Sequence, residues 1–250
     1  MCTAILSIEP GGPVLLAGVR DELVDRPWEQ PARHWTDHPG LIGGRDLLAG
    51  GTWLAVAPGA SRVACVLNGR GVMAPPDARR TRGLLPLQAA DEAKLDPSGL
   101  GGFDPFHLLL AEPGAAMFWS WDGERLAERE LGPGLYIVVN SGLGAAAGDL
   151  REHEQARIAH FLPRLRAAAR PSPGPDGTTA QAWGDWVPLL NGDGLAPDDT
   201  RALIVRRNLG SGRIWGTTSI SVVALGEAGT RYDFTAAPGD PLAWHQVSVV

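Results

Sequence analysis

The start of the chain contains the residue whose chemistry stands out most in this sequence. Cys2 follows Met1 directly, and a small second residue generally permits removal of the initiator methionine. The mature chain would then begin with a thiol and an α-amine on one residue. Because the reference pKa of an α-amine is about 7.7–8.0, it can act as a base near neutral pH. Cys2 therefore fits the arrangement of an N-terminal nucleophile, in which the terminal amine activates the side chain.

Two charged residues are expected beside this cysteine. The apolar segments 3–8 and 14–19 flank a Pro/Gly connection and predict a β-hairpin. With a central turn, paired positions sum to about 22, so Cys2 falls opposite Arg20. Arg20 would lower the pKa of the thiol, and the neighbouring Asp21 would orient the α-ammonium. A frayed terminus followed by a solvated turn contains the same residue types, so spacing alone leaves both interpretations open.

Length and composition narrow the class of protein. The 250 residues, 44% apolar and 20% charged, suit a globular chain with a substantial core. A net charge of −6 does not indicate a nucleic-acid-binding face. No apolar run approaches the ~18 residues of a membrane span, and the first residues lack a signal peptide's basic start. The two cysteines, Cys2 and Cys65, favour a reduced, cytoplasmic protein. A single lysine, Lys94, among 22 basic residues is typical of a GC-rich bacterial genome.

The elements that must position Cys2 are mostly strands. After the first hairpin we expect a polar loop over 21–46, and the Pro/Gly-rich stretch near 171–181 predicts a flexible surface linker. Further strands are predicted at 53–57, 62–67, 106–111, 116–121, 125–131, 135–139, 202–206, 214–225 and 230–234. Helices are predicted at 84–95, 150–170 and 183–190. Strands, then helices, then strands predict one α+β domain over residues 1–250.

Several blocks of the sequence resemble the NRDE family, also called the transport and Golgi organization family. Residues 19–22 (Val-Arg-Asp-Glu) are similar to the namesake Asn-Arg-Asp-Glu, with Val19 in place of the asparagine. Residues 43–46 and 50–54 resemble the family's next block. Individually weaker matches lie at 63–70, 82–84, 106–109 and 215–217. The resemblance therefore spans nearly the whole chain.

The resemblance implies an N-terminal-nucleophile hydrolase fold, a four-layer αββα sandwich of two antiparallel sheets between helices. Choloylglycine hydrolases and penicillin acylases of this fold also begin with a cysteine and use an Arg and an Asp after the first hairpin. By this likeness Cys2 is the nucleophile and Arg20 and Asp21 support it, although the relatives separate the two charged residues. Asn68 and Asn140, each at the end of an expected strand, are the candidates for stabilising an oxyanion.

Two functions follow as expectations. The favoured one is Cys2-dependent hydrolysis of a non-peptide amide or acyl bond. The alternative is a non-catalytic protein that binds or carries haem or an acyl ligand on the same fold, because members of the resembled family have been implicated in haem trafficking and acyl-CoA homeostasis. His34 and His38 share a loop with Trp28 and Trp35 and are the candidate haem ligands.

Cofactor and partner expectations follow from the same residues. The hydrolase requires no cofactor, whereas haem would be a bound ligand in the alternative. No metal site is expected, because no Cys/His pair has the spacing of a structural zinc site. The expected partner is a small-molecule amide, acyl or haem ligand rather than nucleic acid or a membrane. The oligomeric state is left open.

Overall fold

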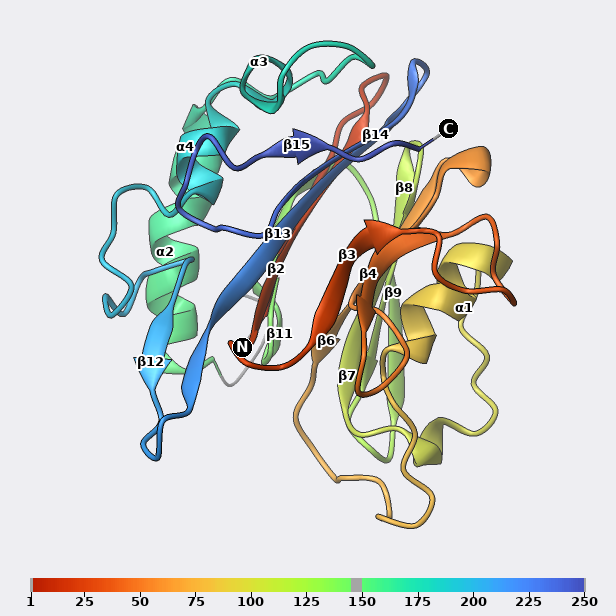
Figure 1. Ribbon diagram of the computed structural model, residues 1–250. Helices are drawn as coiled ribbons and strands as arrows, with labels where there is room; N and C mark the ends of the chain where they lie inside the picture. The colour runs from red at the N-terminus through yellow and green to blue at the C-terminus, as the bar shows by residue number, and fades with distance from the viewer. Residues whose placement is uncertain (1, 145–149, 250) are drawn as a thin grey trace.

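Two antiparallel sheets lie face to face, and helices cover their outer faces (Figure 1). The structure is a computed structural model and describes residues 2–144 and 150–249. Figure 1 shows α2, α3 and α4 on one side of the molecule and α1 on the other. The layer order is therefore αββα, as the family resemblance implied.

The first sheet positions four of the predicted site residues, namely Cys2, Arg20, Asp21 and Asn140. Its strand order is β11-β10-β1-β2-β13-β14-β15, and β12 pairs with β13. The bounds are β1 Thr3–Ile8, β2 Val14–Leu23, β10 Gly134–Val139, β11 Gly142–Leu143, β12 Arg206–Asn208, β13 Ile214–Gly226, β14 Gly229–Thr235 and β15 His245–Gln246. The helices on this sheet are α2 Glu152–Ala167, α3 Thr179–Trp183 and α4 Trp186–Leu190.

The second sheet is a meander in chain order. Its strands are β3 Trp28–Ala32, β4 Ile42–Asp46, β5 Leu54–Ala57, β6 Arg62–Asn68, β7 Phe106–Glu112, β8 Ala115–Trp121 and β9 Leu126–Leu131. Helix α1, Leu84–Glu92, covers its outer face, and short 3-10 turns occupy Pro58–Ala60 and Leu100–Gly102. None of the helices in the described part of the chain has the length and apolar character needed to cross a membrane.

The period-two alternation of the strands divides the core into three layers. In β1, Ala4 and Leu6 pack between the sheets, whereas Ile5 packs against the α2–α4 layer. A third cluster lies between the second sheet and α1. Both faces of the first sheet are thus covered, which explains why β1 and β2 are almost continuously apolar.

The register of the first hairpin is as predicted. Thr3 pairs with Val19 and Ser7 with Leu15, so paired positions sum to 22. Extending this register by one residue places Cys2 beside Arg20.

The expectation of a polar loop over 21–46 is wrong. Strand β2 continues to Leu23, and β3 and β4 form one edge of the second sheet. The Gly43-Gly44 pair lowers the strand propensity of this region, but its lack of side chains is what the packing needs. A Cβ on Gly44 would lie 2.3 Å from Cη2 of Trp53, so only glycine admits that indole ring.

Two secondary-structure predictions for later segments also differ from the structure. The strand predicted at 202–206 is wrong: Leu203 and Val205 are buried without strand pairing, and β12 begins only at Arg206. The side chain of Leu203 fills the helical layer from a loop. The segment predicted as a linker near 171–181 is partly helical, because α3 begins at Thr179, and Arg231 donates hydrogen bonds to three of its carbonyls.

Candidate active site

Cys2 lies immediately before β1, at one end of the first sheet. Its backbone nitrogen donates a hydrogen bond to Oδ1 of Asn140 at 2.9 Å. Its Sγ lies 3.9 Å from the backbone oxygen of Asp21. Asn140 directly follows β10, which pairs with β1 so that Ala4 is opposite Val138. The sheet register therefore carries Asn140 to Cys2.

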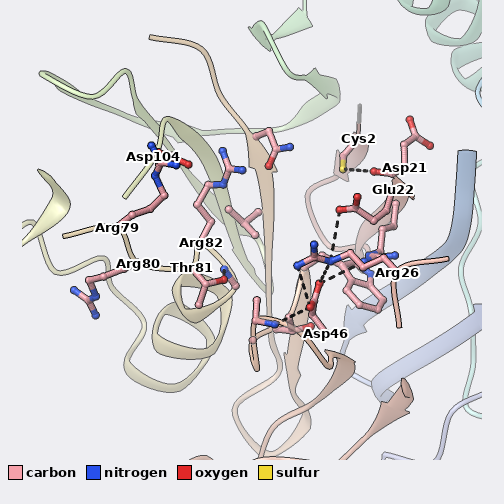
Figure 2. Close-up of a pocket in the computed structure, with 18 residues that line it drawn as sticks. Cys2, Asp21, Glu22, Arg26, Asp46, Arg79, Arg80, Thr81, Arg82 and Asp104 are labelled. Carbon is pink, nitrogen blue, oxygen red and sulfur yellow. Dashed lines mark hydrogen bonds and ion pairs between the residues drawn. The ribbon is translucent and has the colours of Figure 1, made fainter. Parts of the chain in front are cut away.

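Cys2 borders a cavity of about 320 Å³ (Figure 2). One wall comes from the first sheet and includes Arg20 and Glu22. The opposite wall comes from the second sheet and the segment 79–83 that precedes α1. Asn68, the last residue of β6, lines the same cavity. The thiol, an arginine and an amide side chain thus surround one space where a carbonyl group could bind.

Arg20 is a buried cation fixed by three kinds of contact. Its guanidinium carbon lies 4.5 Å from the ring centroid of Trp53, and Nη1 donates to Oγ1 of Thr218 at 2.8 Å. Nη2 lies 3.6 Å from Oδ2 of Asp46. Burial lowers the pKa of Arg20, and the carboxylate of Glu22 acts against this. Arg20 therefore supplies a fixed positive charge beside the thiol.

Asp21 is adjacent to Arg20 in the sequence but faces the other side of β2, because successive strand residues alternate. Its Oδ1 accepts a hydrogen bond from Oγ1 of Thr217 at 2.6 Å. Burial raises the pKa of Asp21, while the positive charge of Arg157 on α2 lowers it. The adjacent Arg-Asp pair thus acts on Cys2 from two faces of one strand.

A β-bulge supplies the two threonines that hold this pair. Opposite β2, the register of β13 shifts between Thr217, which pairs with Asp21, and Ser219, which pairs with Arg20. The extra residue is Thr218. Bulges re-aim side chains next to active sites, and here the consecutive hydroxyls of Thr217 and Thr218 reach Asp21 and Arg20.

Burial opposes ionisation of the resting thiol. Burial raises the pKa of Cys2, and the Asp21 carboxylate adds to this, whereas Arg20 lowers it. Because the thiolate is the nucleophile, a base must take the thiol proton before attack.

Four of the five predicted site residues, Cys2, Arg20, Asp21 and Asn68, line the first cavity. The fifth, Asn140, contacts Cys2 and lines a second cavity of about 300 Å³. With Oδ1 accepting from Cys2, the Nδ2 group of Asn140 forms no hydrogen bond to another described residue and keeps two N–H donors for another acceptor. Asn68 contributes an amide from the first cavity.

Sequence reasoning missed two residues that hold Asn140 in place. His107 on β7 contacts the backbone oxygen of Asn140 through Nε2 at 3.1 Å. Glu154 on α2 is fully buried, and accepts hydrogen bonds from the Ser141 hydroxyl and from the backbone nitrogen of Arg151. His107 lies in one of the matched blocks, which was the available signal. Glu154 had none, because its role depends on how α2 packs.

The candidate haem ligands do not line the cavity at Cys2. His34 contacts the backbone oxygen of Gln30 at 2.8 Å, and His38 contacts Asp91 on α1 at 2.7 Å. Haem ligation at these residues stays a prediction. Across residues 2–144 and 150–249, no three His, Cys, Asp or Glu side chains cluster so as to hold a metal ion.

Two stacked antiparallel sheets between helices define the N-terminal-nucleophile hydrolase fold, and solved structures share it. An N-acylethanolamine-hydrolyzing acid amidase ortholog from Caenorhabditis elegans superposes with a TM-score of 0.50 at 14% identity, covering 97% of this chain and 95% of that one. Penicillin V acylase from Agrobacterium tumefaciens gives a TM-score of 0.51 at 14% identity, with 94% and 83% covered. At such identities the likeness concerns the fold.

Within this fold class, sequence identifies the family. The model of the Transport and Golgi organisation 2 family, TANGO2, matches residues 1–165. The chain belongs to this family, as the blocks at 19–22 and 43–54 predicted. No curated protein matches the sequence.

Proposed function

We propose that the protein is a hydrolase that uses Cys2 as an N-terminal nucleophile to cleave a non-peptide amide or acyl bond. The observation that carries the proposal is the hydrogen bond from the Cys2 nitrogen to Asn140, beside a cavity that the thiol borders. Once Met1 is removed, this nitrogen is the α-amine. Asn140 then holds the base in place through Oδ1, and its own Nδ2 group is the potential oxyanion donor. The two structural neighbours, an amidase and an acylase, support the choice of reaction class.

The acylation step follows from these positions. The α-amine takes the thiol proton, and Sγ attacks the carbonyl carbon of the bound amide. A C–S bond forms and the carbonyl oxygen becomes an oxyanion, which the side-chain amides of Asn68 and Asn140 stabilise. The C–N bond then breaks, and the leaving amine receives the proton from the α-ammonium.

Deacylation restores the enzyme. The α-amine takes a proton from water, and the hydroxide oxygen attacks the thioester carbonyl. The C–S bond breaks, a carboxylic acid leaves, and Sγ recovers the proton from the α-ammonium. The sum is amide plus water to acid plus amine, with no cofactor. Asp21, held by Thr217, supports the α-ammonium electrostatically.

The first test is the intact mass of the purified protein before and after treatment with p-nitrophenyl octanoate. We expect a chain lighter by one methionine that gains one octanoyl group and releases p-nitrophenolate. Cys2→Ala should abolish the label and the turnover of amide substrates while leaving the fold intact.

Cys65→Ala is the matched control, because Cys65 is the other cysteine and lies buried between the sheets. Burial raises the pKa of the Cys65 thiol far above its ordinary value, so its removal should leave labelling unchanged. A chain that retains Met1 when active, or turnover that survives Cys2→Ala, would contradict the proposal.

A further inference from the structure

The cavity beside Cys2 is unusually rich in arginine. Five arginines and four carboxylic acids line it, namely Arg20, Arg26, Arg79, Arg80, Arg82, Asp21, Glu22, Asp46 and Asp104. Three of the arginines lie within the four residues 79–82 of one segment. Their pairing with the acids decides which charges are left for a ligand.

Two of the acids are already neutralised within the protein. Asp46 forms an ion pair with Arg26 at 2.6 Å, and Arg20 lies 3.6 Å from it. Asp104 pairs with Arg79 at 3.1 Å. The negative charges of Asp46 and Asp104 therefore compensate the positive charges of the arginines with which they pair.

Arg82 is different. Its Nη1 donates to the backbone oxygen of Pro105 at 2.9 Å, and within the described chain Arg82 forms no ion pair. A guanidinium has five N–H donors, so most of those of Arg82 remain for a ligand. Burial lowers the pKa of Arg82, and the carboxylates of Asp104 and Glu22, with Cys2 when it is a thiolate, act against this. Its cation is thus partly desolvated and within electrostatic reach of Cys2.

Figure 2 shows how the segment directs these side chains. Arg82 extends into the space between its own segment and Cys2, whereas Arg80 extends away from the cysteine. Arg80 instead lies over the ring of Phe103, with 4.5 Å between the guanidinium carbon and the centroid. Of the two cavity arginines that form no ion pair within the described chain, Arg82 is therefore the one that faces the reaction site.

The backbone that carries Arg82 is fixed. The oxygen of Gly83 accepts a hydrogen bond from the backbone nitrogen of Thr52 at 2.9 Å. Gly51 lies so close to this segment that a Cβ on it would be 2.4 Å from the carbonyl carbon of Gly83. A pre-positioned guanidinium pairs with a carboxylate through two parallel N–H···O bonds at little entropic cost.

We propose that Arg82 binds a carboxylate on the amide substrate, so that the preferred substrates are N-acyl amino acids rather than neutral N-acyl amines. This inference rests on the proposed hydrolase function for its substrate but concerns binding alone. The cavity of about 320 Å³ holds a small amino acid moiety beside the scissile bond.

The test compares two ligands that differ only in this charge, N-octanoylglycine and N-octanoylglycinamide. Calorimetric titration of the Cys2→Ala protein measures binding without turnover. We expect N-octanoylglycine to bind at least about tenfold more tightly, as a charged hydrogen-bonded pair provides. The preference should shrink as NaCl is added, because salt screens partly exposed charges.

Substitutions assign the preference to Arg82. In the Cys2→Ala background, Arg82→Gln should abolish it, whereas Arg129→Gln, which removes an exposed arginine on β9, should leave it unchanged. Arg82→Lys keeps the charge without the planar pair of donors, so it should retain only part of the preference, and it decides the question if Arg82→Gln folds poorly.

The outcomes separate this inference from the hydrolase proposal. Equal binding of both ligands, no binding of either, or a preference that survives Arg82→Gln overturns the role of Arg82. Failure of the wild-type protein to hydrolyse any amide, together with an Arg82-dependent preference, instead overturns the hydrolase and leaves the carboxylate site standing.

Discussion

The backbone nitrogen of Cys2 lies 2.9 Å from Oδ1 of Asn140, although 138 positions separate them in the sequence. The contact depends on the pairing of β1 with β10 and on the turn that follows β10. It orients the asparagine so that Oδ1 faces the nitrogen, and in the proposed mechanism Nδ2 donates to the substrate oxygen. One hydrogen bond therefore assigns the two ends of the Asn140 amide to different tasks.

Asn140→Asp separates these tasks. The carboxylate keeps an acceptor for the Cys2 nitrogen but lacks the Nδ2 donors and places negative charge near the oxyanion. We expect kcat for N-octanoylglycine to fall about 10²–10³-fold, the typical effect of losing an oxyanion donor. Cys2 alkylation by iodoacetamide should persist. Asn208→Asp, at an exposed position on β12, is the control and should keep wild-type kcat. A variant at position 140 as fast as wild type would exclude the donor role.

Arg20→Lys tests whether the guanidinium or only its charge matters. Lysine keeps the charge but loses both the planar stack on Trp53 and the geometry of the Thr218 bond. Because the Arg20 charge lowers the pKa of the Cys2 thiol, a displaced charge should raise that pKa further. The rate of Cys2 alkylation should then reach its plateau at a higher pH than in the wild type. An unchanged alkylation profile would mean that charge alone suffices.

Local sequence patterns predict the part of the site that contains Cys2 and Arg20. The hairpin is short, its turn contains Pro and Gly, and both strands are apolar, so its register could be predicted without a structure. That register brings Arg20 to Cys2. Asn68 and Asn140 could be named only from the family resemblance, because a strand-end asparagine is ordinarily turn chemistry.

The remainder depends on contacts between distant segments. Thr217 and Thr218 reach β2 only because β13 pairs with it across almost 200 positions and bulges at that point. The glycine pair of β4 weakens the local signal for that strand, and the role of Gly44 in admitting Trp53 is visible only in the folded structure. Arg82 is likewise identified by which carboxylates are already paired, which is a property of the folded cavity.

Gly51→Ala tests the close approach that fixes the segment of Arg82. A Cβ would lie 2.4 Å from the carbonyl carbon of Gly83, so the two backbones must separate. We expect a loss of about 2 kcal/mol in the free energy of unfolding, as for other overpacked sites, and a Tm lower by about 4–8 °C. The KM for N-octanoylglycine should rise because Arg82 moves.

Gly40→Ala is the matched control, since a Cβ there meets no atom within 4 Å. Its Tm and KM should stay near wild-type values. If Gly51→Ala were as stable as Gly40→Ala, the contact between the two segments would not constrain Arg82.

His107 links the site to pH. Its Nε2 contacts the Asn140 oxygen, while Nδ1 is buried without a hydrogen-bond partner in the described structure, and the ring stacks on Phe118. Burial lowers the pKa of His107, although its hydrogen bond to Asn140 and the charge of Glu154 act against this. The folded protein therefore binds fewer protons here than the unfolded chain, and stability must fall as the pH drops below about 6.5, the ordinary histidine pKa, towards the lower folded value.

His107→Gln removes the titrating group and keeps an N–H donor for Asn140. Comparing Tm between pH 7.5 and 5, we expect the wild type to lose more stability on acidification than His107→Gln, so that the gap in their Tm values changes in favour of the variant at low pH. His245→Gln, at an exposed position on β15, controls for loss of a histidine as such. Parallel plots of Tm against pH for wild type and His107→Gln would show that His107 binds protons equally in the folded and unfolded states. The link between pH and the site through His107 would then be excluded.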